Sequence, residues 1–270
     1  MTLTICIICM IAGLFGIIWC AKKQKSVANA QLYAVICLAV ILVSAGVALV
    51  DTFFGDDIET RRYNANQDQF ERSRLNAIAE HVNKNYGGKN VVILVHESEI
   101  PNSTNSSYIR IDKVKELKAL LKNVNVLDTV VIKPTPVAEG QEEVIDESRS
   151  VKSFNKMFDE CKNLHPNAII DLAGLPTEGE AGKLKIWKWK GKDDPKLILA
   201  HVDDIGGSFQ PADFMGVLDC VVMSRNDGKF DWQNGTAPKD LKEAFDAVYV
   251  LVSKDNIKQL VKDKVISLGE

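Results

Sequence analysis

The stretch Val91-Val92-Ile93-Leu94-Val95 (VVILV) is an uninterrupted apolar run that begins three residues after the pair Gly87-Gly88. A run this short and this uniformly apolar is typical of a strand buried on both faces of a parallel sheet. Apolar residues at helical spacing precede it over residues 66–86, and the two glycines mark the end of that predicted helix. The run therefore predicts a helix followed by a central strand.

The same alternation continues to the end of the chain. Further strands are predicted at residues 126–132, 168–172, 197–202, 220–223 and 247–252, with a short edge strand at 265–268. Helical apolar spacing falls within residues 114–121, 151–161, 241–245 and 257–261. This order favours an α/β fold: a mainly parallel, doubly wound, Rossmann-like sheet with a helical layer on each face.

The rhythm is least regular at residues 175–195, where a short helix, a hairpin or an extended arm must make the crossover. As a whole, the alternation is similar in a general way to one lobe of periplasmic sugar-binding proteins. That likeness concerns the rhythm of strands and helices, and it implies no residue roles.

Two apolar runs precede the α/β pattern. Residues 3–20 (LTICIICMIAGLFGIIWC) and 31–50 (QLYAVICLAVILVSAGVALV) carry no charge. Each can cross a hydrocarbon core of about 30 Å as a helix that rises about 1.5 Å per residue. We therefore expect both runs to lie in a lipid bilayer. A cleaved signal peptide fits the first run poorly, because Met1-Thr2 carries no Lys or Arg.

These patterns divide the chain into three parts. Residues 1–52 are predicted to form a transmembrane helical hairpin, residues 53–65 a juxtamembrane linker, and residues 66–270 the α/β domain. Lys22, Lys23 and Lys25 lie in the loop between the apolar runs. Under the positive-inside rule the Lys22–Lys25 loop is cytoplasmic. The α/β domain is then extracytoplasmic, in a periplasm or at the cell surface.

Charge and cysteine content limit the partners of the protein. The formal net charge is −3, which argues against nucleic acid as a partner because phosphate binding needs concentrated Lys and Arg. Four of the six cysteines fall in the apolar runs. The other two, Cys161 and Cys220, are more readily interpreted as isolated buried thiols than as a disulfide.

In open α/β sheets, ligands bind beyond the carboxyl ends of the strands, so the loops at that edge are the expected site. The candidate ligand-binding residues there are His96, Glu97, Asp171, His201, Asp203, Asp204, Gly206 and Gly207. The segment Ser253-Lys254-Asp255 is assigned to the same edge, with Asp255 as a helix N-cap. The alternative for all of these residues is structural, because polar side chains end most strands and cap the helices that follow.

Two other segments suggest binding sites. The segment of residues 174–183 resembles a phosphate loop in its glycines, but Glu180 follows Gly179 and Leu184 follows Lys183, so the Gly-Lys-Ser/Thr chemistry is missing. Residues 185–192 interleave lysines with Trp187 and Trp189. This strip could contact a protein partner or a membrane surface. The favoured interpretation is a crossover whose rings pack on the core while the lysines remain solvated.

The leading functional hypothesis is a membrane-anchored extracytoplasmic α/β domain that binds a small polar ligand or a protein partner, in a sensor or solute-binding role. The first alternative is a metal-assisted hydrolase, because His96 and His201 each end a strand and carboxylates follow both. The second alternative is a structural or assembly scaffold. No nucleophile motif is present, which favours a binding protein over an enzyme. The sequence assigns no catalytic residue, cofactor or metal site.

Overall fold

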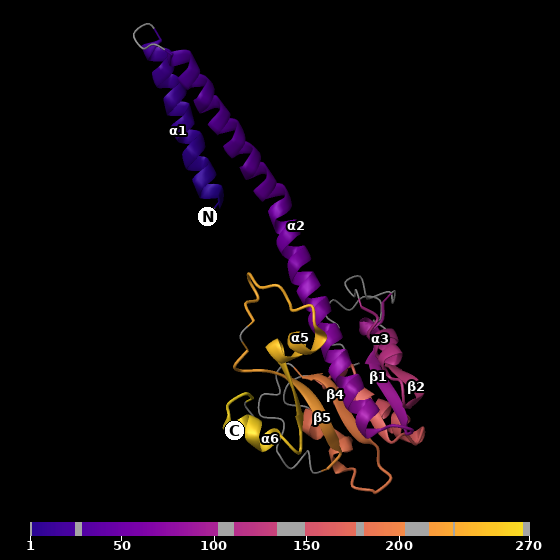
Figure 1. Ribbon diagram of the computed structural model, residues 1–270. Helices are drawn as coiled ribbons and strands as arrows, with labels where there is room; N and C mark the ends of the chain where they lie inside the picture. The colour runs from indigo at the N-terminus through magenta and orange to yellow at the C-terminus, as the bar shows by residue number, and fades with distance from the viewer. Residues whose placement is uncertain are drawn as a thin grey trace. The chain divides into compact units, whose positions relative to one another are not determined.

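The computed structural model describes residues 2–24, 29–101, 111–133, 149–176, 181–202, 216–228 and 230–266. The chain divides into two units, Met1–Ala65 and Asn66–Glu270. Figure 1 shows both along the course of the chain. The second unit contains the sheet.

The first unit consists of α1 (Thr2–Lys23) and the beginning of α2 (Ala30–Asn85). Both contain a stretch long and apolar enough to cross a membrane, Cys6–Lys23 and Ala30–Leu49. The two helices approach closely at a glycine, since a Cβ on Gly16 would lie 2.6 Å from Sγ of Cys37. The segment of residues 53–65, expected as a linker, is helical because α2 runs through it without a break.

The second unit is built on a six-stranded sheet with the order β2-β1-β3-β4-β5-β6. Strands β1 to β5 run parallel, and β6 pairs antiparallel with β5. The strands are β1 (Asn90–His96), β2 (Asn125–Ile132), β3 (Ala168–Asp171), β4 (Lys196–Val202), β5 (Leu218–Ser224) and β6 (Tyr249–Ser253). The prediction of a mainly parallel α/β sheet is confirmed.

A layer of helices covers each face of this sheet, because β1, β3 and β4 bury side chains of alternating residues on both sides. On one face, the C-terminal part of α2 packs with α3 (Lys113–Leu120) and α5 (Leu241–Val248). On the other face lie α4 (Val151–Asn163) and α6 (Ile257–Lys262). The domain is therefore doubly wound and three-layered, as predicted.

Polar residues fix where the helices begin and end. Oδ1 of Asp112 accepts a hydrogen bond from the backbone of Lys115 at the start of α3. Asp240 caps α5 in the same way, as expected for short polar side chains at N-caps. The polypeptide leaves α2 through Gly88, whose φ of 73° is a conformation that glycine adopts without strain.

Three details differ from the sequence-based expectations or complete them. The crossover at residues 175–195 contains two short 3-10 turns, η3 (Ala181–Lys183) and η4 (Lys185–Lys188). Val265 and Ile266, expected to begin an edge strand, are bends. The expected N-cap at Asp255 is wrong, because Asn256 holds that position before α6.

Candidate functional site

The strand order brings the predicted residues of the carboxyl edge onto adjacent strands. Asp171 ends β3 and pairs in register with Leu94 of β1 and Leu199 of β4. His96 in β1 and His201 in β4 each lie two residues beyond these register positions. Since β3 separates β1 from β4, the backbones at His96 and His201 are about 10 Å apart, two inter-strand spacings. The sheet therefore places Asp171 between the two strands that carry the histidines.

Asp171 is fully buried and lies on the same sheet face as Leu94, among the residues that pack against α4. Its Oδ1 accepts a hydrogen bond from the backbone N–H of Ala173 at 2.8 Å. Its Oδ2 has no hydrogen-bond partner among the residues that the structure describes. Burial raises the pKa of Asp171 to about 8, and the backbone N–H groups of Ala173 and Gly174 lower it by less. The carboxyl is therefore mostly protonated at neutral pH.

His96 is buried and forms the N-cap of the 3-10 turn η1 (Glu97–Glu99). Its Nδ1 accepts from the backbone N–H of Ser98 at 3.2 Å and lies 2.6 Å from the Ser98 hydroxyl oxygen. Nδ1 of His96 therefore serves as a cap of the turn that follows the strand, which is the structural alternative given above for this residue. Glu97, also predicted at this site, is partly exposed beside it.

The other predicted residues of this edge cannot be added to that geometry. Asp203, Asp204, Gly206 and Gly207 lie outside the described residues, and so does the side chain of His201. The metal-assisted hydrolase built on the two histidines and their carboxylates stays a prediction.

The tryptophans of the basic and aromatic strip contribute to the core. Trp187 Nε1 donates a hydrogen bond to the carbonyl oxygen of Ala181 at 2.7 Å. Nζ of Lys162 lies 4.6 Å from the ring centroid of Trp189, a cation–π contact. Both rings are partly buried against the core beneath α4, whereas Lys188 is exposed. This is the crossover arrangement that the sequence favoured.

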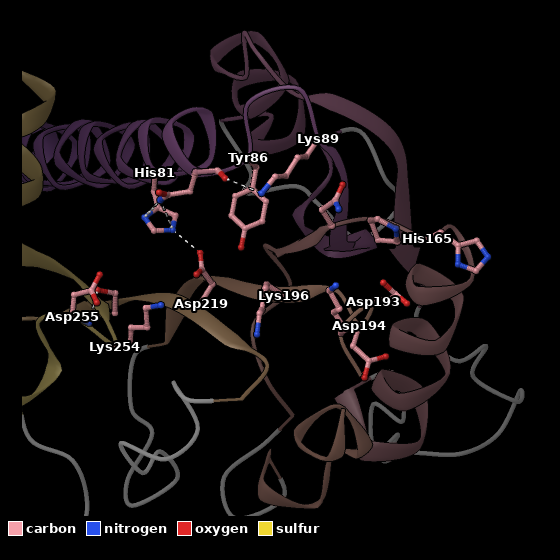
Figure 2. A pocket seen from close by; sticks show the side chains of 15 residues that line it. His81, Tyr86, Lys89, His165, Asp193, Asp194, Lys196, Asp219, Lys254 and Asp255 are labelled. Carbon is pink, nitrogen blue, oxygen red and sulfur yellow. Dashed lines mark hydrogen bonds and ion pairs between the residues drawn. The ribbon is translucent and has the colours of Figure 1, made fainter. Parts of the chain in front are cut away.

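A second group of polar side chains, not predicted from the sequence, surrounds a cavity of about 640 Å³ at the amino edge of the sheet. Figure 2 shows it from close by. Its charged and titratable lining residues are His81, Tyr86, Lys89, His165, Lys192, Asp193, Asp194, Lys196, Asp219, Lys254 and Asp255. Ser253-Lys254-Asp255 was assigned to the carboxyl edge, which is wrong. Because β6 runs antiparallel to β5, the segment that follows it returns to the amino edge.

The closest contact in this cavity joins α2 to β5. His81 Nε2 lies 2.7 Å from Oδ2 of Asp219, and the Asp219 carboxylate also accepts a hydrogen bond from Tyr86. Burial raises the pKa of Asp219, but its bonds to His81 and Tyr86 and the charge of Lys196 outweigh this and hold it below its ordinary value. Burial and the charge of Asp219 raise the pKa of Tyr86 well above its usual range.

Cys220 lies beside this pair and is fully buried. Burial and the neighbouring carboxylate of Asp219 raise the pKa of its thiol. A thiol in such surroundings is protonated and unreactive, so the cluster lacks an activated nucleophile. The sequence offered only a weak signal for this site: His81 falls on the polar side of a predicted helix, and Asp219 directly precedes a buried run.

The chain matches no family model and no curated protein. Solved structures with a related arrangement of strands and helices include AraP, an arabinose binding protein from Geobacillus stearothermophilus, at 11% identity and a TM-score of 0.39. A sugar ABC transporter protein from Actinomyces odontolyticus matches at 12% and 0.39. The Caulobacter myo-inositol binding protein matches at 13% and 0.37.

Each of these matches covers 70% of this chain, and respectively 62%, 63% and 60% of the other protein. This chain therefore spans less than two thirds of the length of each solved structure. At these identities the similarity concerns the fold, and no residue role is taken from it.

Proposed function

We propose that the protein is anchored in a membrane by α1 and the apolar part of α2, and that its α/β domain binds a small polar ligand at the carboxyl edge of the sheet. The anchor is supported by the surfaces of the two helices. The apolar window within Ala30–Leu49 buries none of its residues inside the protein, and the window at Cys6–Lys23 buries only 17%. Large apolar side chains such as Phe15, Leu42 and Val43 are more than 60% exposed.

A core helix of a water-soluble protein would bury such side chains, and continuous apolar surface of this kind marks contact with lipid or protein. We expect the full-length protein to remain in the membrane pellet after extraction with alkaline carbonate. Release of the intact chain into the supernatant would contradict the anchor.

The ligand site is supported by one observation above all: the buried Asp171 carboxyl, whose Oδ2 has no hydrogen-bond partner among the described residues. Unsatisfied buried polar atoms are rare, because each costs about 1–3 kcal/mol of stability. This one ends the strand between β1 and β4, at the edge where open α/β sheets bind ligands. A ligand oxygen would complete its hydrogen bonding.

The protonation of Asp171 indicates the class of ligand. With a pKa of about 8, the carboxyl is a neutral donor at pH 7 and suits an uncharged acceptor such as a hydroxyl or carbonyl oxygen.

The test is calorimetric titration of the full-length protein in detergent with uncharged sugars, polyols and amino acids. The panel includes arabinose and myo-inositol, named for two of the solved structures above. For any ligand that binds, Asp171→Asn should weaken affinity at least about tenfold, which corresponds to about 1.4 kcal/mol. Asp159→Asn, an exposed site on α4, is the matched control and should leave affinity unchanged. No binding across the panel, or equal affinity in both variants, would overturn the ligand proposal.

The orientation of the anchor is a separate part of the proposal. Lys22 and Lys23 end α1, which supports a cytoplasmic loop and an extracytoplasmic domain. Both thiols of the domain are fully buried, so a cysteine introduced by Lys188→Cys would add one exposed thiol. Labelling of this variant in intact cells by a membrane-impermeant maleimide is expected. Labelling only after lysis would reverse the topology, and the parent protein supplies the background.

A further inference from the structure

The cavity at the amino edge contains three side chains of the kinds that bind transition metals. A ring nitrogen of His81, an Asp219 carboxylate oxygen and Cys220 Sγ all lie within 4.8 Å of one another. Imidazole, carboxylate and thiolate are the ligand types that zinc sites combine, at metal–ligand distances of about 2.0–2.3 Å. We propose that His81, Asp219 and Cys220 bind a Zn²⁺ ion.

A bulge in β5 makes this combination of ligands possible. Asp219 and Cys220 are consecutive residues, which in a regular strand point to opposite faces of the sheet. Here Leu197 pairs with Leu218 and Ile198 pairs with Cys220, so Asp219 is an extra residue in the strand. Cys220 is buried on the face covered by α2, and the bulge lets Asp219 reach His81 of that helix. Bulges often re-aim side chains in this way at functional sites.

The surrounding groups are those that orient metal ligands. The Tyr86 hydroxyl is directed toward Asp219 (Figure 2). This hydroxyl donates a hydrogen bond to the Asp219 carboxylate. The Asn85 amide nitrogen lies 3.2 Å from Nδ1 and 3.3 Å from Nε2 of His81, so the amide borders the imidazole ring. Hydrogen bonds to the outer side of ligating imidazoles and carboxylates are a regular feature of zinc sites.

Charge explains why a cation suits this cluster. The Asp219 carboxylate brings a negative charge to the cluster, and a divalent cation balances this charge. On binding, Zn²⁺ forms a bond to Sγ as the thiolate, and the thiol proton passes to water. The thiolate selects Zn²⁺ over Mg²⁺ and Ca²⁺, which prefer oxygen ligands.

The three ligands leave one position of a tetrahedral site for an external group. His81 and Asp219 line the cavity, whereas Cys220 lies behind them in the core. Lys196, also in the lining, donates to the carbonyl oxygen of Gly216 at 2.7 Å. A water molecule from the cavity would complete the coordination, as in zinc sites with three protein ligands.

The experiment uses full-length protein in detergent, stripped of metal with a chelator and titrated with Zn²⁺ in a calorimeter. We expect one Zn²⁺ per chain. Replacement by Co²⁺ should give a thiolate-to-cobalt charge-transfer band in the near ultraviolet, which Cys220→Ser abolishes. His81→Ala and Asp219→Asn should each weaken Zn²⁺ binding by about 10-fold to 100-fold or more.

Two controls separate the site from its surroundings. His165→Ala removes another histidine of the same cavity, and Cys161→Ser removes the other buried thiol of the domain. Both variants should bind Zn²⁺ as the parent does, with the cobalt band intact. The proposal is overturned if the parent binds no Zn²⁺, or if its Co²⁺ complex has no thiolate band.

The zinc proposal is also overturned if the control variants lose Zn²⁺ binding as much as the ligand variants do. Should Cys220→Ser fail to fold, the parent spectrum and the two other ligand variants still decide the result. This site lies at the opposite edge of the sheet from Asp171, so it stands or falls independently of the proposed ligand site.

Discussion

Nε2 of His81 and Oδ2 of Asp219 lie 2.7 Å apart, and this contact ties the last turns of α2 to the start of β5. Both side chains are largely buried, with 14% and 27% of their surfaces exposed. The sequence separation of 138 residues makes this a long-range tertiary contact. In the absence of metal we expect this contact to stabilise the fold.

We expect Asp219→Asn to lower the free energy of unfolding at pH 7 by about 1.5–3 kcal/mol, the contribution of a charged hydrogen bond. The folded-state pKa of Asp219 lies below 3.8, so its stabilisation is present above that pH and is lost as the pH falls through the folded value. The difference between parent and variant should therefore shrink below pH 3.8. Urea denaturation with chelator present measures it. Asp193→Asn in the same cavity is the control. If Asp219→Asn lowered the free energy of unfolding equally at pH 7 and below pH 3.8, the mechanism would be contradicted.

Asp171 should have the opposite pH dependence. Its pKa rises from 3.8 to about 8 on folding. The stability that the protonated carboxyl contributes is therefore fully present below pH 3.8 and is lost as the pH rises through 8. Between these values the free energy of unfolding should fall by about 1.4 kcal/mol per pH unit. Asp171→Asn should flatten this slope and be more stable than the parent at pH 8. Thermal unfolding across this pH range is the measurement, and Asp128→Asn at an exposed site is the control. If the stability of the parent and of Asp171→Asn changed with pH in the same way, the prediction would be refuted.

Asn66 holds the segment before α5 against α2. Its Nδ2 donates to the carbonyl oxygen of Gly235 at 3.0 Å, and its Oδ1 accepts from the backbone of Ala237 at 2.8 Å. Asn66 is only 2% exposed, so Asn66→Ala leaves the carbonyl oxygen of Gly235 and the N–H of Ala237 without their hydrogen-bond partner. We expect the free energy of unfolding to fall by about 2–4 kcal/mol. Gln69→Ala, which removes a partly exposed contact with Pro238, should cost less than half as much in the same denaturation experiment. Equal losses would show that burial is not the cause.

Trp187 distinguishes a core residue from a docking residue. Trp187→Ala removes the hydrogen bond to Ala181 and a partly buried ring, so we expect a loss of about 2–3 kcal/mol in unfolding free energy. The exposed neighbour Lys188→Ala should change it by less than about 0.5 kcal/mol. An unchanged stability in Trp187→Ala would instead favour the scaffold alternative, in which this strip binds a partner.

The strands could be predicted because each is an apolar run with a clear beginning and end, as in VVILV of β1. The sequence of a strand contains no comparable pattern that indicates its direction in the sheet. The run in β6 has the same composition whether it lies parallel or antiparallel, so Ser253-Lys254-Asp255 was assigned to the wrong edge. Asp171 and His96 could be named as candidates because each ends a strand. That their strands are adjacent depends on the strand order, which the chain determines only through tertiary packing.

The cluster at the amino edge could not be predicted for a related reason. His81 and Asp219 meet only after α2 has docked on the sheet. The bulge that re-aims Asp219 is a mismatch between two strands, and neither strand alone records it. Local sequence patterns report periodicity and caps, whereas this site depends on register.

Cys161 and Cys220 belong to the two cores on opposite faces of the sheet, and both are free thiols. The thickness of the sheet keeps them from forming a bond with each other. The described part of the domain therefore holds its fold without a bond between these two cysteines, and we expect reductants such as glutathione to leave that fold intact. A domain built in this way does not depend on its compartment to supply a disulfide.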